Sequence, residues 1–97
     1  MKITDYVFLK KLCELPFIDA VWLYGSRARG DQQERSDFDL AILCPRAQRE
    51  DWLKIVEIID SADTLLNIDY VRFDDLPNTS PLKKNILHDK KILYERK

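Results

Sequence analysis

Two aspartates, Asp37 and Asp39, stand two residues apart at the start of an apolar segment that ends at Leu43. Alternate residues of a β-strand point to the same face, so both carboxylates are predicted to project to one side, with Cα atoms about 7 Å apart. Like charges at this spacing repel each other, and proteins mostly avoid the arrangement unless a cation lies between them. The pair therefore predicts a site for a divalent metal ion.

A glycine-serine pair, Gly25 and Ser26, follows the preceding apolar segment. Glycine permits a sharp turn that a residue with a Cβ atom would resist. If a short helix begins near Ser26, its backbone N–H groups and the serine hydroxyl can donate hydrogen bonds to an anion such as a phosphate. Arg27 and Arg29 come next and are candidates to neutralise phosphate charge, although solvated charges on a helix surface give the same pattern.

A third carboxylate, Asp69, stands early in another predicted strand. If that strand is a neighbour of the strand carrying Asp37 and Asp39, the three side chains can meet at one end of the sheet. Three carboxylates can hold two Mg²⁺ ions about 3.5–4 Å apart, the spacing that clamps the attacking and leaving oxygens of a phosphoryl displacement. Mg²⁺ takes its remaining ligands from water and substrate phosphates, so a nucleoside triphosphate is the expected substrate. Asp69 is also a candidate general base, and a solvated strand-end carboxylate is the alternative interpretation.

The elements that must position these residues alternate along the chain. Helices are predicted over 4–15, with Thr4 as its cap, over a short stretch from 26 that Gly30 ends, over 46–65 and over 80–88. Strands are predicted over 18–24, 37–43, 68–73 and 91–95. This order favours an α/β (α+β) fold with a small mixed, largely antiparallel sheet and helices packed on one face.

Composition narrows the class of protein. With 97 residues the chain is expected to form one domain over 1–97, and its formal net charge of -1, without a basic block, does not indicate a nucleic-acid footprint. No apolar run approaches the roughly 18 residues needed to span a membrane. Only Cys13 and Cys44 are cysteines, which favours free thiols in a reducing, cytoplasmic setting.

The segment GSRARGDQQERSDFDL carries a family resemblance. Its Gly25-Ser26 pair is followed by ten residues and then by Asp-x-Asp, which resembles the signature of the DNA polymerase β-like nucleotidyltransferase superfamily. The short length makes the chain most similar to the minimal nucleotidyltransferases, including MntA-type antitoxins. The segment IDYV, with Asp69, is similar to the strand of the superfamily's third carboxylate, and the resemblance extends over nearly the whole chain to HDKKILYE.

The resemblance implies both a fold and a reaction. The fold is a small mixed sheet with helices on one face, and the reaction transfers a nucleoside monophosphate from a triphosphate with two Mg²⁺ ions and releases pyrophosphate. By the resemblance, Asp37 and Asp39 hold the metals, and Asp69 binds one metal and activates the acceptor. Gly25 and Ser26 hold the triphosphate.

For minimal members, the resemblance also implies a partner. It is a small helical HEPN-domain toxin, the other half of a type VII toxin–antitoxin pair, and one of its tyrosines accepts AMP from ATP. The extra domain with which larger relatives bind an antibiotic, RNA or DNA has no counterpart in this sequence, which favours a protein acceptor over nucleic acid. Two alternatives stay open: a non-catalytic antitoxin that covers the toxin, and transfer to a small molecule such as an aminoglycoside. The assembly, a homodimer or a hetero-oligomer with the toxin, also stays open.

Overall fold

Helices and strands alternate in the computed structural model, which describes residues 3–31 and 37–96. The helices are α1 (Val7–Glu14), α2 (Ser26–Arg29), α3 (Arg49–Asp60) and α4 (Pro81–Asp89), with 3-10 turns η1 (Ile3–Asp5) and η2 (Phe73–Asp75). The strands are β1 (Ala20–Tyr24), β2 (Phe38–Leu43), β3 (Ile68–Arg72) and β4 (Lys91–Glu95). No helix among these described residues is both long and apolar enough to cross a membrane.

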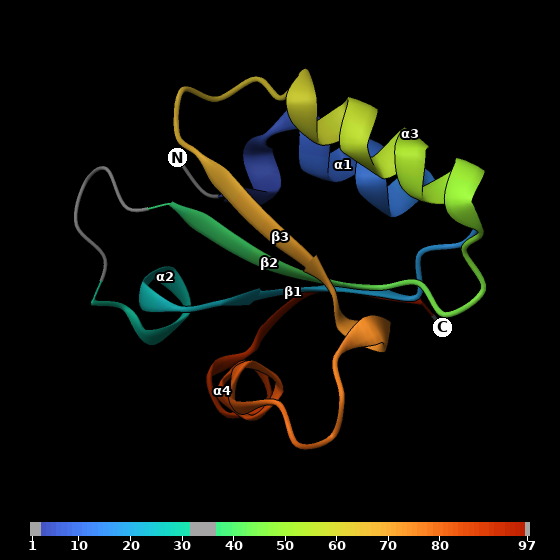
Figure 1. Ribbon diagram of the computed structural model, residues 1–97. Helices are drawn as coiled ribbons and strands as arrows, with labels where there is room; N and C mark the ends of the chain where they lie inside the picture. The colour runs from blue at the N-terminus through green and yellow to red at the C-terminus, as the bar shows by residue number, and fades with distance from the viewer. Residues whose placement is uncertain (1–2, 32–36, 97) are drawn as a thin grey trace.

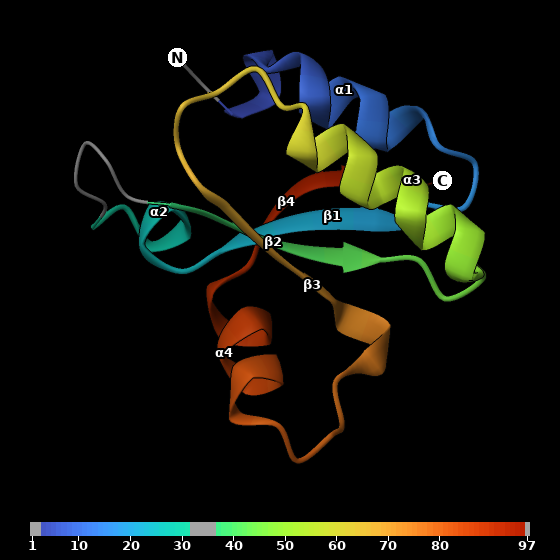
Figure 2. The ribbon, with the colours of Figure 1, turned by 45° about the horizontal axis from the view of Figure 1, so that its top comes forward.

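The four strands form one mixed sheet in the order β3-β2-β1-β4. β1 pairs antiparallel with both β2 and β4, whereas β2 and β3 run parallel. A parallel pair needs a long crossover connection, and α3 supplies it between β2 and β3 (Figure 2). The prediction of a mixed, largely antiparallel sheet is confirmed.

The larger part of the core lies between the sheet and the helices α1 and α3, which cover the same face (Figure 1). Alternate residues of β2 point to this face because side chains of a strand alternate between its two sides. The fully buried side chains of this cluster include Leu12 of α1, Leu40 and Ile42 of β2, and Ile55 of α3. This layer is the one that the predicted fold anticipated.

The prediction that helices pack on one face is correct for α1 and α3 but wrong for α4, which lies on the opposite face (Figure 1). The side chains of Trp22 and Ala41 point to that face. Because exposing apolar surface to water is unfavourable, another element must cover them. Phe73 of η2 and Ile86 of α4 provide the cover, and the Trp22 and Phe73 rings meet edge to face with centroids 5.1 Å apart. The sheet is therefore the middle of three layers.

The start of α1 depends on a residue far along the chain. Thr4 was expected to cap this helix but lies in η1, and α1 begins at Val7. The carboxylate of Asp63 instead accepts hydrogen bonds from the backbone N–H groups of Val7, at 3.0 Å, and Phe8, at 3.1 Å. These bonds hold the pKa of Asp63 below its ordinary value. Asp63 lies within the predicted helix 46–65, which is too long, since α3 ends at Asp60 and leaves the following loop free to reach α1.

Truncation of Ile86 tests whether the second apolar cluster holds α4 on the sheet. Ile86 is fully buried, so Ile86→Ala is expected to lower the free energy of unfolding by about 2–5 kcal/mol through lost burial and a cavity. The neighbouring Leu87 is 47% exposed, and Leu87→Ala is expected to change stability by no more than about 0.5 kcal/mol. Urea unfolding of both variants measures the difference; equal effects would show that α4 contributes little to the folded state.

Candidate active site

Asp39 and Asp69 are register partners in the parallel pair β2 and β3. Each is the second residue of its strand, so both lie at the end of the sheet where β2 and β3 begin. We call this end the carboxylate edge. Neighbouring strands are only about 4.8 Å apart. Alternation places both carboxylates on the same side as Ala41 and Val71, which pack in the cluster under α4. The condition set by the sequence, that the strands be neighbours, is therefore met.

Asp37 lies one residue before β2, because the strand begins at Phe38 rather than at the predicted residue 37. The N–H of Phe38 donates to the backbone oxygen of Asn67 at 3.0 Å, which joins the start of β2 to the segment leading into β3. Asp37 is partly buried. It thus stands beside the strand-start carboxylates without being part of the sheet.

The acidic side chains act on one another electrostatically. Partial burial raises the pKa of Asp39, and the charges of Asp69 and Asp37 raise it further, while Arg29 opposes them. Tyr24, which pairs with Asp39 from β1, responds in the same way: burial, and then the charges of Asp39 and Asp69, raise its pKa. The site is therefore a patch of unfavourable negative charge.

The chemistry of these side chains suits Mg²⁺, which prefers carboxylate oxygens and keeps several water or phosphate ligands. Across residues 3–31 and 37–96, however, no three side chains of His, Cys, Asp or Glu are gathered so that they could hold a metal ion. The predicted ligands Asp37, Asp39 and Asp69 are thus neighbours that do not converge. After burial, the charges of Asp69 and Asp37 raise the pKa of Asp39, and a cation between the carboxylates would reverse that part of the effect.

The turn at Gly25 is fitted against Asp39. Gly25 has φ 76° and ψ -156°, a region of backbone space that essentially only glycine occupies. A Cβ atom there would lie 2.4 Å from Oδ2 of Asp39. The N–H groups of Ala28 and Arg29 both donate to the Gly25 oxygen at 3.1 Å, which closes α2 around Ser26. The predicted turn and the predicted carboxylates are therefore brought together.

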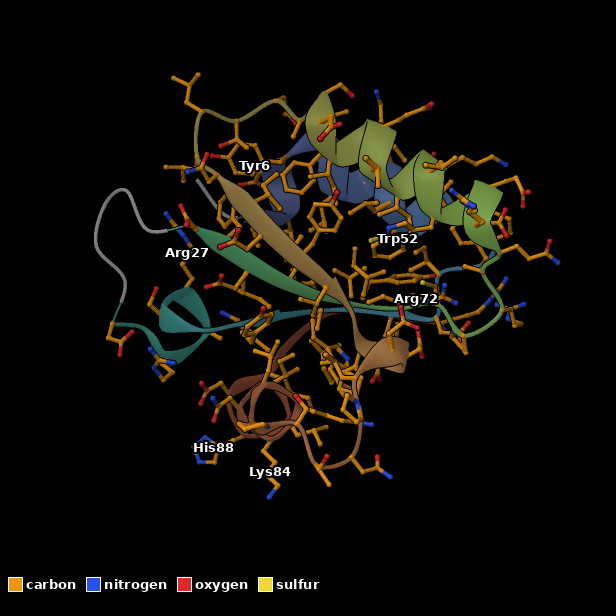
Figure 3. The ribbon with its side chains drawn as sticks, in the orientation of Figure 1. Tyr6, Arg27, Trp52, Arg72, Lys84 and His88 are labelled. Carbon is orange, nitrogen blue, oxygen red and sulfur yellow. The ribbon has the colours of Figure 1, made fainter. Side chains whose placement is uncertain are left out.

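The two predicted arginines, Arg27 and Arg29, extend toward opposite faces of the sheet. The guanidinium of Arg27 stacks over the ring of Phe38, 4.5 Å from its centroid, and Phe38 packs on the face of α1 and α3 (Figure 3). Arg29 instead reaches α4, where its Nη1 donates to Asp89 at 2.9 Å. Only Arg29 is on the side of Asp39, whose pKa it lowers.

Two residues near the site were not anticipated from the sequence. Tyr24 is the last residue of β1, directly before the Gly25 turn, and it pairs with Asp39 of β2. Once β1 and β2 are paired, strand alternation places its side chain next to the carboxylates. Asp89 is the last residue of α4, a position where an acid is disfavoured by the helix dipole. An acid at the end of a predicted helix is unusual, and that position could have drawn attention to Asp89.

Two surface grooves lie beside β3, the first on its α3 side and the second between α3 and the segment after β3. The first, of about 390 Å³, lies by Ile59, Leu66 and Tyr70, and the second, of about 550 Å³, by Trp52, Val71 and Leu76. Neither groove is lined by Asp37, Asp39 or Asp69. The carboxylate edge is thus separate from both.

Comparison with known proteins adds a family and a fold. A family model described as "Polymerase beta, Nucleotidyltransferase" matches residues 8–97. The protein named "Putative protein adenylyltransferase MJ1215" from Methanocaldococcus jannaschii is 37% identical over 59 residues, which are 61% of this chain and 66% of that protein. The match thus spans just under two thirds of the relative's length.

Two solved structures share the fold. One is described as the crystal structure of a toxin-antitoxin with AMP-PNP; the match covers 93% of this chain and 73% of that chain, with 22% identity and a TM-score of 0.63. The other is a mutant of the toxin-antitoxin MntA-HpeT, for which the match covers 93% and 69%, with 18% identity and a TM-score of 0.58. At these identities the likeness is one of fold.

The fit between Gly25 and Asp39 can be tested with a matched pair of glycines. Gly30 also has a positive φ, 84°, but a Cβ atom there meets nothing within 4 Å, so Gly30→Ala carries only left-handed backbone strain, about 1–2 kcal/mol. Gly25→Ala is expected to lower the free energy of unfolding by more than this, because it adds the clash with Oδ2 of Asp39. In an Asp39→Ala background the excess is expected to shrink. Urea unfolding of the wild type, Asp39→Ala and each glycine variant in both backgrounds measures the difference, and equal costs for the two glycines would contradict a close fit.

The raised pKa of Asp39 predicts a pH-dependent stability. A carboxyl whose pKa is higher in the folded chain than in the unfolded chain opposes folding once it ionises, so its penalty is absent at low pH and present above the folded value. Asp39→Asn is therefore expected to raise the Tm at pH 7 without divalent cations, and this gain is expected to vanish near pH 3, below the ordinary Asp pKa of about 3.9. Thermal melts at both pH values measure it, with Asp60→Asn, at the exposed end of α3, as control. An unchanged Tm at pH 7 would contradict the crowding of negative charge.

Proposed function

Because the chain belongs to the polymerase β nucleotidyltransferase family, we propose that it transfers AMP from ATP, with Mg²⁺, to a hydroxyl of a partner protein. One observation carries the proposal: Asp39 lies beside Asp69 at the sheet edge where the Gly25 turn packs against the Asp39 carboxylate. Acidic ligands and a turn suited to phosphate thus share one small area. The name protein adenylyltransferase, which the archaeal relative carries, supports AMP as the transferred group.

Asp37, Asp39 and Asp69 would hold the metal in this proposal. Two Mg²⁺ ions bound there would neutralise phosphate charge and stabilise the attacking and leaving oxygens. The residues fit this role by chemistry, since all three supply oxygen ligands and the like charges that, after burial, raise the pKa of Asp39 favour a cation among them. Binding must draw the carboxylates together, because they do not converge on their own.

The other residues of the site position the reactants. The Gly25 turn lets the backbone approach the triphosphate, and the Ser26 hydroxyl donates a hydrogen bond to it. Asp69, exposed at the edge, accepts the proton of the incoming hydroxyl. The hydroxyl oxygen bonds to the α-phosphorus as the bond to the β-phosphate oxygen breaks, and pyrophosphate leaves. Since Arg27 is stacked over Phe38, we assign it no phosphate contact.

The acceptor is proposed to be a tyrosine of a HEPN-domain toxin in the cytoplasm, with this chain as its antitoxin. Both structural neighbours are described as toxin-antitoxin structures, one of them with AMP-PNP, which supports an ATP-like nucleotide and a toxin partner.

A non-catalytic antitoxin is the second candidate. It is favoured by one observation, that the carboxylates of the described residues do not converge on a metal position. In that case the chain neutralises the toxin by covering it, and a variant without Asp39 still protects cells. Loss of protection in Asp39→Asn, with the folded protein present at normal levels, would favour catalysis.

Label transfer tests the catalytic proposal. Incubated with α-labelled ATP, Mg²⁺ and the toxin, the wild-type chain is expected to label the toxin, and Asp39→Asn is expected to lower the rate by at least about 10²–10³, the cost of removing a main electrostatic group. Asp60→Asn, at the end of α3 on the face of the sheet opposite Asp39, serves as the matched carboxylate control and is expected to keep the wild-type rate. Label transfer that persists in Asp39→Asn would overturn the assignment of the site.

A further inference from the structure

The carboxylate of Asp89 is held from two directions. Its side chain is only 11% exposed, and it accepts a hydrogen bond from Nη1 of Arg29 at 2.9 Å. His88 approaches it with Nδ1 at 2.8 Å, while the same Arg29 donates from Nε to Asp31 at 3.1 Å. Figure 3 shows His88 on the outer side of α4, away from the sheet. Arg29 therefore binds two carboxylates at once, those of Asp31 and Asp89.

Asp89 occupies a position that is unfavourable for its own helix. It is the last residue of α4, where the negative end of the helix dipole repels an acid. A carboxylate that is mostly shielded from water also needs a charged partner. Arg29 provides this charged partner, and the hydrogen bonds with His88 and Arg29 hold the pKa of Asp89 below its ordinary value. The Asp89 carboxylate is thus stabilised in part by Arg29, a residue of α2 rather than of its own helix.

The helix α2 is held on one side by Ala28, which packs on the main core, and by Arg27, which stacks over Phe38; Arg29 is its contact with α4. The helix α2 has four residues, and none of their side chains is fully buried. Arg29 is the last of them, while the first, Ser26, follows the Gly25 turn that fits against Asp39. A contact that fixes Arg29 therefore fixes the other end of the same short helix.

We propose that Asp89 and Arg29 are a positioning pair that ties α2, and with it the Gly25–Ser26 turn, to α4. The pair touches no reacting atom. Its consequence for catalysis rests on the proposed function, in which this turn receives the triphosphate. Arg29 then acts through Asp89 rather than as a phosphate ligand, and α4 belongs to the scaffold of the site.

The proposal differs from a direct phosphate role for Arg29 in what Asp89 does. If Arg29 binds phosphate, Asp89 competes for it, so removal of the Asp89 charge leaves ATP binding unchanged or tightens it. If the two form a positioning pair, removal of either charge loosens the turn, and removal of both is no worse than Arg29→Gln alone, which also breaks the bond to Asp31. The double-mutant cycle therefore separates the two roles.

The experiment uses Arg29→Gln, Asp89→Asn and the double variant in the full chain. In label transfer with the toxin, each single variant is expected to raise the KM for ATP about tenfold with a much smaller change in kcat, and the double variant is expected to match Arg29→Gln. Asp19→Asn is the control, because it breaks an exposed ion pair with Arg46, at 2.8 Å, at the other end of β1. It is expected to leave the KM unchanged.

Amide hydrogen exchange gives a readout that needs no substrate. The N–H groups of Ala28 and Arg29, which donate to Gly25, are expected to exchange about tenfold faster in Asp89→Asn, while those of β1 and β2 stay as in the wild type. Asp89→Glu keeps the charge and is expected to keep most of the protection. These measurements decide the positioning role even if the wild type transfers no AMP, so the two proposals fail separately.

Three results would overturn the positioning pair. The first is unchanged exchange in α2 of Asp89→Asn. The second is a raised KM in Arg29→Gln alone, with Asp89→Asn unchanged or tighter, which would show that Arg29 binds phosphate by itself. The third is additive effects in the double variant, which would show that the two residues act independently.

Discussion

The parallel pairing of β2 with β3 sets Asp39 directly beside Asp69, and the arrangement of the rest of the chain follows from it. Parallel strands cannot be joined by a tight turn, so α3 must cross over the sheet, and it covers the face opposite the carboxylates. That face receives the larger apolar cluster, which gives the sheet its rigidity. The acidic face is left with shallower cover, from η2 and α4.

The apolar core that stabilises the fold and the candidate active site therefore lie on opposite faces of the sheet. Partial burial of the Asp39 carboxylate, and then the like charges of Asp69 and Asp37, raise its pKa and oppose folding once it ionises. The core between β2, α1 and α3 offsets this cost through side chains such as Leu40, Ile42 and Ile55, all fully shielded from water. The site can therefore be unfavourable locally while the domain as a whole is stable, as is common where function constrains residue choice.

Local patterns in the sequence predicted the parts of the fold that depend on neighbours in the chain. Alternation placed Asp37 and Asp39 on one face, with Asp69 joining them only if the two strands were neighbours, and Ser80 before Pro81 marked the start of α4, where its side chain accepts from the Lys83 N–H. The face that α4 covers was not predicted, although Trp22 and Ala41, apolar residues on that side of the sheet, called for a cover. The apolar residues on both faces of β1 indicated cover on both sides, whereas the predicted architecture placed the helices on one face only.

Other features depend on contacts that no local pattern contains. The cap of α1 comes from Asp63, 56 residues away from Val7, and nothing near either residue indicates the pairing. The separation of Arg27 from Arg29 is different, since residues two apart on a helix point to nearly opposite sides, and helical geometry alone would have divided them. The convergence of carboxylates on a metal was predicted from residue types, and the described structure places them as neighbours only.

The contact between Arg29 and Asp89 joins residues 60 positions apart, which bears on when the site can form as the protein is made. Contacts between residues far apart in the sequence form late in folding, because the chain loses the entropy of closing a long loop before the contact stabilises it. On the ribosome, β1, α2 and β2 emerge well before α4, so the nascent chain carries its acidic edge before it carries the helix that braces α2. Synthesis through Asp89 is therefore the earliest point at which the complete brace exists.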